Sequence, residues 1–471
     1  MIELTLGEVA EIVGGRLSGA DPATVVRGSV EFDSREVSPG GLFLALPGEH
    51  VDGHDYVAAA TAAGAAASLV TRPVDGPAVE VEDGVAALGA LASAVARRLP
   101  EMTVVGITGS SGKTSTKDLV AQLLARLGPT VAPPGSYNNE LGHPYTVLRA
   151  TRETRFLVLE TSARGIGHIR YLTEIAPPDI GVVLNVGTAH LGEFGSREAI
   201  AQAKGELVEA LPAHGLAVLN ADAPLVAAMA ARTQARVVTV GTAGADIHAA
   251  NVTLDDLGRP SFTLVSGDVR AEVALRLVGA HHVGNALAAA AVAIECGMSI
   301  ADAAAALTEA RSRSRWRMEV TERPDGVVVI NDAYNANPES MTAALDALAV
   351  IARGRREGRS FAVLGPMAEL GPDAPDEHAA IGRRVAELGV SRLVAVGEQA
   401  RPIQRGAALE SSWRGESSWV PDTESAIALL RGELRPGDAV LVKASNSARL
   451  ERVALAIAGD ANANENGGGT G

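Results

Sequence analysis

Residues 106–118 read GITGSSGKTSTKD, a glycine- and serine-rich turn that runs into a lysine and a threonine. The β-branched run before it (103–108, TVVGIT) predicts a buried strand, and the segment after it (113–128, KTSTKDLVAQLLARLG) predicts an amphipathic helix. Loops between a strand and a helix bind phosphate, because backbone N–H groups and the positive helix end point at the anion. Gly109 and Gly112 stand only three positions apart, so the common G-x-x-x-x-G-K-[ST] spacing is not met. We therefore predict a shortened phosphate-binding loop, with a plain surface turn as the alternative.

Apolar runs and helical segments alternate on both sides of this loop, which predicts an α/β protein of three domains. Residues 1–100 read as a small α/β unit, and 101–316 as a unit with a mostly parallel sheet and an antiparallel patch at about 246–278. Residues 317–459 alternate again and predict a Rossmann-like unit. The polar, glycine-rich end, 460–471, predicts a disordered tail.

Composition narrows the class of protein. The net charge of −15 argues against a nucleic-acid or anionic-membrane partner. No stretch approaches the ~20 apolar residues of a membrane span, and the N-terminus lacks the pattern of a signal peptide. A single cysteine, Cys296, excludes an intramolecular disulfide, and its alanine-rich surroundings predict a buried, inert thiol. We expect a cytoplasmic protein without membrane insertion.

Only four of the 41 basic residues are lysines. Where positive charge alone is enough this chain uses arginine, so a lysine suggests that the amine itself is needed. Lys113 is expected to reach the β- and γ-phosphate oxygens of a nucleotide. Lys204 lies on a predicted helix, where a lysine is ordinarily exposed to solvent. The alternative interpretation is a lysine that reacts with CO₂ and holds a metal ion as a carbamate. Lys117 and Lys443 receive no role from the residues alone.

Candidate metal ligands follow two further predicted strands. Glu160 ends the run RFLVLE, and His190 follows the run NVGTA. The carboxyl ends of parallel strands line the crevice in which α/β sheets bind ligands. Glu160 and Thr114 offer the oxygen ligands that Mg²⁺ prefers, whereas histidine is unusual for so hard an ion. Considered alone, the position of His190 favours an ordinary loop or core histidine over a metal ligand.

Two later segments place amide side chains near a predicted domain junction. Asn285 begins a predicted helix (285–296), where its amide either caps the helix or reads the edge of a base. The stretch NDAYNANPESM (331–341) follows an apolar strand and is either turn chemistry or part of a site. The density of polar groups at a junction favours a site.

Taken together, these segments resemble the Mur ligase family, the ATP-dependent amide ligases of peptidoglycan assembly. TGSSGKTST is similar to that family's T-G-x-x-G-K-[ST] loop, and DSREVSPGGLFLALPGEHVDGHDY resembles its uridine-binding module. The branch that adds D-Ala-D-Ala to UDP-MurNAc-tripeptide is the most similar, on the segments YNNELGHP, NVGTAHLGEFGS, AKGEL, RWRMEV, NDAYNANPESM and LGPMAELG. His282 stands where the family often has asparagine.

The resemblance implies roles for individual residues. Lys113, Glu160, His190 and Lys204 would be catalytic. ATP would be bound by Thr108, Gly109, Ser110, Ser111, Gly112, Lys113, Thr114, Ser115, Asn285, Arg317 and Asp332. Mg²⁺ would be held by Thr114, Glu160, His190 and carbamylated Lys204. Ser34 and Arg35 would contact the uridine nucleotide, Asn138, Thr161 and Ser162 the muropeptide, and Tyr334, Asn335 and Asn337 the dipeptide.

The resemblance also implies a reaction. ATP would phosphorylate the terminal carboxylate of UDP-MurNAc-tripeptide, and the amine of D-Ala-D-Ala would attack the resulting acyl phosphate. The enzyme would be a monomer, and its third domain would close over the site. Open alternatives are a sister ligase that adds diaminopimelate or lysine, a folate polyglutamylating enzyme, a P-loop ATPase or kinase without ligation, and a non-catalytic nucleotide-binding module.

Overall fold

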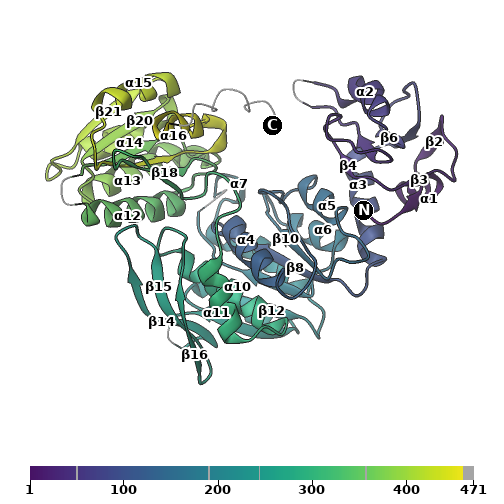
Figure 1. Ribbon diagram of the computed structural model, residues 1–471, viewed down its shortest axis with the longest axis horizontal. Helices are drawn as coiled ribbons and strands as arrows, with labels where there is room; N and C mark the ends of the chain where they lie inside the picture. Colours follow the sequence, from purple (N-terminus) through teal and green to yellow (C-terminus); the bar gives the residue numbers. More distant parts are fainter. Residues whose placement is uncertain (49–50, 189–190, 243, 356–357, 460–471) are drawn as a thin grey trace.

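The computed structural model describes residues 1–459 apart from 49–50, 189–190, 243 and 356–357 (Figure 1). The expected tail, 460–471, and His190 therefore lie outside the described residues. Three units follow one another along the chain, each built on its own main sheet. Figure 1 shows the central unit below, the N-terminal unit at the upper right and the C-terminal unit at the upper left.

The N-terminal unit has a five-stranded sheet in the order β2-β7-β6-β5-β4, parallel except for β2. Its strands are short: β2 (Arg16–Ser18), β4 (Val30–Glu31), β5 (Leu42–Leu44), β6 (Ala67–Val70) and β7 (Ala78–Glu80). A further pair joins β1 (Leu4–Thr5) and β3 (Val25–Val26), and the helical segments are α1 (Leu6–Val13), η1 (Gly53–Tyr56), α2 (Val57–Ala62) and α3 (Gly84–Arg97). Side chains of α1 and α3 share one apolar core with the central strands β8 and β10, which fixes this unit against the central one.

The central unit has a nine-stranded sheet in the order β16-β15-β14-β13-β12-β11-β8-β10-β9. The strands from β8 to β14 pair in parallel, and β14, β15 and β16 form the antiparallel patch. Their bounds are β8 (Thr103–Thr108), β9 (Thr130–Val131), β10 (Phe156–Glu160), β11 (Ile180–Val183), β12 (Leu216–Asn220), β13 (Arg236–Gly241), β14 (Ile247–Leu254), β15 (Pro260–Ser266) and β16 (Val269–Ala274). The inner parallel strands are buried on both faces, as their continuous apolar sequences require.

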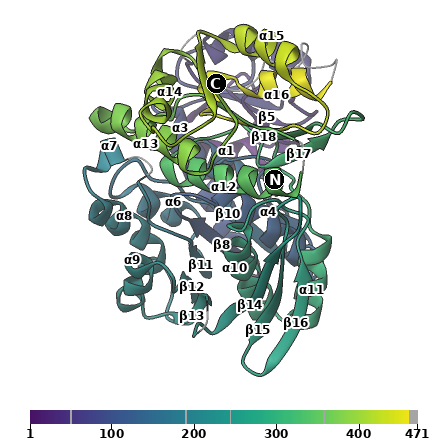
Figure 2. The same ribbon diagram turned by 90° about the vertical axis from the view of Figure 1, so that its left-hand side faces the viewer.

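Helices cover both faces of the central sheet (Figure 2). One face carries α4 (Lys113–Leu124), α10 (His282–Glu295) and α11 (Ile300–Glu309), which share a core with β8 and β11. The opposite face carries α6 (His168–Ile175) and α8 (Arg197–Glu209). Shorter segments are α5 (Gly142–Val147), α7 (Leu191–Phe194), α9 (Pro224–Ala227) and η2 (Ala228–Arg232).

The C-terminal unit has a six-stranded sheet in the order β17-β18-β22-β19-β20-β21, parallel except for β17. Its strands are β17 (Glu319–Glu322), β18 (Val328–Asp332), β19 (Ser360–Leu364), β20 (Arg392–Val396), β21 (Glu416–Val420) and β22 (Ala439–Lys443). Apolar cores lie on both faces of the sheet. The helical segments are α12 (Pro338–Gly354), η3 (Gly371–Asp373), α13 (Ala374–Glu387), η4 (Glu398–Ala400), α14 (Arg401–Ala408), α15 (Thr423–Glu433), η5 (Asn446–Ala448) and α16 (Glu451–Ala458).

The predicted fold class is confirmed, with two local corrections. Helix α10 begins at His282, so Asn285 sits in its first turns and does not cap it. Cys296 is half-buried instead of buried, although burial still raises the pKa of its thiol to about 11, which keeps it protonated and unreactive. No helix within the described residues is long and apolar enough to cross a membrane.

Candidate active site

The phosphate loop joins β8 to α4 as the sequence predicts. Gly112 ends the loop with φ +82°, a left-handed conformation that favours glycine, and a Cβ there would lie 2.6 Å from Oδ1 of Asn285. The absence of a side chain therefore lets α10 approach the loop. Lys113 folds back so that Nζ donates to the carbonyl of Gly109 at 2.7 Å. Burial lowers the pKa of Lys113 to about 8, against the opposing attraction of Glu160.

Glu160 lies beside this loop, because β10 and β8 are neighbours and Glu160 pairs with Ile107. Its side chain is fully buried, and Oε2 accepts hydrogen bonds from the hydroxyls of Thr114 and Ser136, both at 3.2 Å. The other oxygen, Oε1, is buried and has no hydrogen-bond partner among the described residues. Burial raises the pKa of Glu160, and nearby Lys117 opposes that shift. An unpartnered carboxylate oxygen next to a hydroxyl fits a hard cation.

The described residues hold no group of three His, Cys, Asp or Glu side chains that would enclose a metal ion by themselves. A cation next to Glu160 would therefore take its remaining ligands from phosphate, from water, or from groups outside this set. Mg²⁺ is commonly bound in that way, through one or two carboxylates and the phosphates of a substrate.

Lys204 is buried within α8, with 4% of its surface exposed. It shares a face of the helix with Ile200 and Val208, four positions away on either side, and that face packs against the sheet. The reading of Lys204 as a solvated lysine is therefore wrong. Burial lowers its pKa well below the ordinary value, and the charge of Lys113 lowers it further. Burial and the nearby charge of Lys113 both favour the neutral form of this amine.

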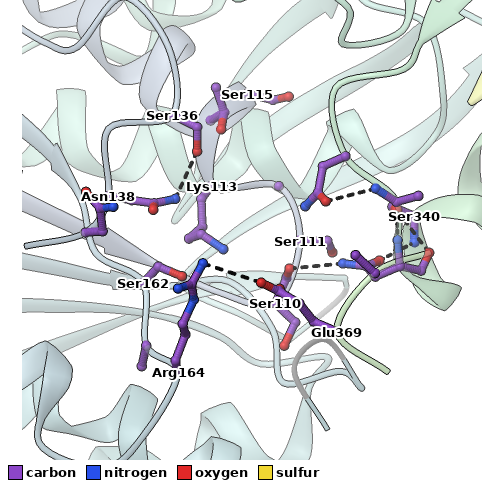
Figure 3. A pocket seen from close by; sticks show the side chains of 18 of the residues that line it. Ser110, Ser111, Lys113, Ser115, Ser136, Asn138, Ser162, Arg164, Ser340 and Glu369 are labelled. Atoms are coloured by element: carbon purple, nitrogen blue, oxygen red, sulfur yellow. Dashed lines mark hydrogen bonds and ion pairs between the residues drawn. The ribbon is translucent and has the colours of Figure 1, made fainter. Parts of the chain in front are cut away.

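A cavity of about 220 Å³ opens above the phosphate loop, between the central and C-terminal units (Figure 3). Its lining is mostly polar and includes Lys113, Thr114, Asn138, Ser162 and Asn335. Figure 3 shows Arg164 and Glu369 meeting across it, with 3.5 Å between their charged groups. On the other side, Asn138 donates to the hydroxyl of Ser136 at 2.9 Å.

An adjoining cavity of about 130 Å³ lies between α10 and the C-terminal unit. Asn285 faces it and contacts Nδ1 of His282 at 3.3 Å. Asp332 faces it from the other side, where its carboxylate accepts from Lys443 Nζ at 2.6 Å and from the backbone N–H of Met318 at 3.1 Å. Buried Lys443 thus has a partner that the sequence alone did not supply.

Two side chains of the C-terminal segment reach the phosphate loop directly. The guanidinium of Arg317 donates to Thr114 Oγ1 at 3.2 Å and stacks on the ring of Tyr334, 4.3 Å from its centroid. Asn337 caps α12 by accepting from the backbone N–H of Ser340 at 2.9 Å, and its amide donates to the carbonyl of Ser110 at 3.3 Å. The loop is therefore held between two units of the chain.

Three family comparisons cover most of the chain. Residues 107–293 match the Mur ligase middle domain, 316–446 the Mur ligase glutamate ligase domain, and 28–109 the catalytic domain of the Mur ligase family. The chain belongs to the Mur ligase family. Residues 107–114 of the phosphate loop lie within the match to the middle domain.

Relatives of this Mur ligase are similar over nearly their whole length. A protein from Mycobacterium tuberculosis named UDP-N-acetylmuramoyl-tripeptide–D-alanyl-D-alanine ligase is 56% identical over 98% of both chains. The protein of that name from Escherichia coli is 35% identical over 97% of this chain and 99% of its own. A crystal structure of MurF from Acinetobacter baumannii has a TM-score of 0.86 at 31% identity, over 97% of this chain and 99% of that one. MurF ligase from Thermotoga maritima, solved in complex with ADP, has a TM-score of 0.78 at 30% identity, over 91% and 97%.

Several predicted site residues of this Mur ligase do not line either cavity. Thr108 and Thr161 are buried, and their hydroxyls donate to the backbone carbonyls of Thr161 and Ile107. Arg35 is exposed and forms an ion pair with Asp33, and Ser34 is half-buried beside it. The roles of these residues, like that of His190, stay predictions.

The cavities also contain residues that the sequence reasoning did not select. They are Ser136, Asn139, Glu140, Arg164, His168, Glu339, Ser340 and Glu369. Glu339, Ser340 and Glu369 stand inside the segments NDAYNANPESM and LGPMAELG, so the signal was present there. Glu339 accepts from the backbone N–H of Thr188 at 2.6 Å and from its hydroxyl at 3.0 Å, a further bridge between the units.

Proposed function

We propose that this Mur ligase joins D-Ala-D-Ala to UDP-MurNAc-tripeptide in an ATP-dependent reaction that yields UDP-MurNAc-pentapeptide, ADP and phosphate. The observation that carries the proposal is the 56% identity, over 98% of both chains, to a relative named for that ligation. The polar cavity above the phosphate loop supports it, because a single space adjoins Lys113 and the amide-rich turn of the C-terminal unit.

The reaction has two chemical steps. The carboxylate of the tripeptide attacks the γ-phosphorus of ATP, the bond to the β-phosphate oxygen breaks, and ADP leaves. The amine of the dipeptide then attacks the carbonyl carbon of the acyl phosphate, loses a proton, and the tetrahedral intermediate expels phosphate. The first step brings two anions together, so the ammonium of Lys113 and the N-terminal end of α4 are assigned to bind the phosphates.

Magnesium is assigned to the unpartnered oxygen of Glu160. Thr114, Glu160 and His190 would hold it with the phosphates, and carbamylated Lys204 would hold a second ion. When bound, Mg²⁺ would neutralise phosphate charge. Carbamylation requires a neutral amine that attacks CO₂ and releases a proton, and the buried, pKa-lowered amine of Lys204 is suited to it.

The three units divide the substrates between them in this proposal. Residues 1–100 bind the uridine nucleotide through Ser34 and Arg35, and residues 101–316 bind ATP and the muropeptide. Residues 317–459 supply Arg317 and Asp332 to the nucleotide and the 334–337 turn to the dipeptide. We assign the reaction to a cytoplasmic monomer.

Phosphate release tests the proposal. Purified protein receives ATP, Mg²⁺ and UDP-MurNAc-tripeptide, with D-Ala-D-Ala present or omitted, and the product is identified by mass. Release that depends on the dipeptide, with formation of the pentapeptide, supports the assignment. ATP hydrolysis that is indifferent to the dipeptide indicates an ATPase, and ligation of diaminopimelate or lysine to the shorter UDP-MurNAc-dipeptide indicates a sister ligase. Tripeptides ending in diaminopimelate and in lysine, compared side by side, identify the natural acceptor.

A further inference from the structure

Lys117 is enclosed within the helix that follows the phosphate loop. Its side chain is 1% exposed, and Nζ donates to Asp118 Oδ1 at 2.6 Å, to the carbonyl of Pro133 at 2.8 Å and to the hydroxyl of Ser314 at 3.4 Å. Each hydrogen of the ammonium therefore has an acceptor. A buried charge is stable only when it is paired in this way. Lys113 is the lysine assigned to phosphate binding, so the presence of Lys117 in the same helix needs a different explanation.

The partner of Lys117 holds the chain that leads out of the central unit. This linker, residues 311–316, connects α11 to the segment that begins with Arg317. Asp118 Oδ2 accepts from the backbone N–H groups of Ser314 at 2.8 Å and Arg313 at 3.2 Å. Such charge-assisted hydrogen bonds are about twice as strong as neutral ones.

One turn further along α4, a second side chain continues the attachment. Gln122 donates to the carbonyl of Arg311 at 2.9 Å and accepts from its N–H at 3.1 Å. The linker is therefore fastened along α4 from residue 311 to residue 314.

The chain beyond the fastened part is short and conformationally constrained. Trp316 and Met318 have φ of +58° and +51°, values that residues with side chains adopt only where their surroundings fix them. Between them, Arg317 reaches Thr114 and the ring of Tyr334. Only three peptide steps separate Ser314 from Arg317, a reach of about 10 Å at full extension. A shift of the linker is thus passed on to the guanidinium.

We infer that Lys117 and Asp118 are positioning residues for Arg317. A single helix carries Thr114 in its first turn and the Lys117–Asp118 pair one turn later. Arg317 is therefore connected to Thr114 in two ways. It donates directly to the hydroxyl of Thr114, and the linker before it is bonded to Asp118 on the same helix as Thr114. The pair ties the linker, residues 311–316, to the helix that follows the phosphate loop, so that a nucleotide bound to the loop contacts Arg317 in a fixed position. This inference rests on the proposed ligation, whose rate is the readout.

A double-mutant cycle on kcat tests the inference. Wild type, Lys117→Met, Arg317→Lys and the double variant are compared in the ligation assay. We expect Lys117→Met to lower kcat by about 10-fold or more, since a displacement of about 1 Å lowers rates strongly. In the Arg317→Lys background the same change should have less than about a 2-fold effect, because coupled residues are not additive. Hydrogen exchange of a peptide covering 311–317 should accelerate in Lys117→Met.

The control removes another buried cation that is remote from the linker. Arg392 is 8% exposed and bonds both oxygens of Glu433 at 2.9 Å within the C-terminal unit. Arg392→Met should lower the melting temperature yet leave kcat within about 2-fold in both backgrounds. If Lys117→Met acted only by lowering stability, Arg392→Met would lower kcat to a similar extent.

Three results would overturn the inference: an unchanged kcat in Lys117→Met, an equal decrease in both backgrounds, or unchanged exchange in the linker. If Lys117→Met does not fold, Gln122→Ala replaces it, since it removes two linker bonds without leaving a buried charge, and the same criteria apply. Absence of ligation by the wild type would instead refute the proposed function, which keeps the two failures distinct.

Discussion

The buried amine of Lys204 leads to a prediction that is independent of catalysis: at alkaline pH this amine binds a proton less readily in the folded protein than in the unfolded chain. In the unfolded chain the amine titrates at its ordinary value of 10.5, whereas burial lowers the folded pKa well below that. Between the two values the unfolded state holds an extra proton, so the free energy of unfolding rises with pH. One proton corresponds to about 1.4 kcal/mol per pH unit.

The assay measures that proton directly. Wild type and Lys204→Met are unfolded with guanidinium at pH 9 in weakly buffered, CO₂-free solution, and the uptake of protons is followed by back-titration. We expect the wild type to take up more protons per chain than the variant, because the folded pKa of Lys204 is lowered. Methionine fills a similar volume without an ionisable group, and Lys113, whose folded pKa is about 8, contributes to both proteins.

Equal uptake by the two proteins would refute the reasoning, since it would mean that Lys204 is charged when folded. A charged amine does not react with CO₂, so the carbamate proposal would fail with it. Restoring bicarbonate provides the second arm. On unfolding, a carbamate takes up water and a proton and yields the ammonium and bicarbonate, so the wild type should release bicarbonate and Lys204→Met should not.

Three further outcomes follow from the site. Lys204→Ala should abolish ligation and recover part of it with bicarbonate and a short carboxylic acid, whereas full activity in Lys204→Arg would contradict the carbamate. Glu160→Gln should lower kcat about 10²–10³-fold while the melting temperature is kept, and a rate within 2-fold of wild type would remove Glu160 from the metal site. Asn337→Ala should destabilise α12 by about 1 kcal/mol through loss of its cap. Asn337→Asp should keep the wild-type melting temperature, because aspartate also caps the helix. Its kcat should still be lower than that of the wild type, because aspartate cannot donate a hydrogen bond to the carbonyl of Ser110.

The sequence predicted those elements whose signals are local. TVVGIT is buried almost throughout and became β8, and the loop after it needed only a glycine with positive φ and a following helix. The edge strand β21 was not foreseen, because only Val420 of its five residues is buried and no apolar run marks it. Propensity and periodicity report burial, so strands without it are missed.

The site was predictable in part for the same reason. Glu160 ends β10, and Thr114 lies at the start of the helix that follows the neighbouring strand β8. The alternation of strands and helices predicts parallel strands whose carboxyl ends meet at one edge of the sheet. The role of Lys117 was not predictable, because its contact with Ser314 joins positions 197 residues apart. The burial of Lys204 could have been predicted from the sequence, since Lys204 occupies an apolar position of its helix.

The ion pair between Arg164 and Glu369 bears on how the enzyme admits its substrates. Its partners belong to different units and are 68% and 38% exposed, so the contact is worth no more than about 1 kcal/mol and is screened by salt. This exposed ion pair is therefore weaker than the buried attachment of the linker to Asp118. As ionic strength rises, we expect this contact between the units to weaken first, while the hydrogen bonds of Glu339 to Thr188 and of Asn337 to Ser110 persist.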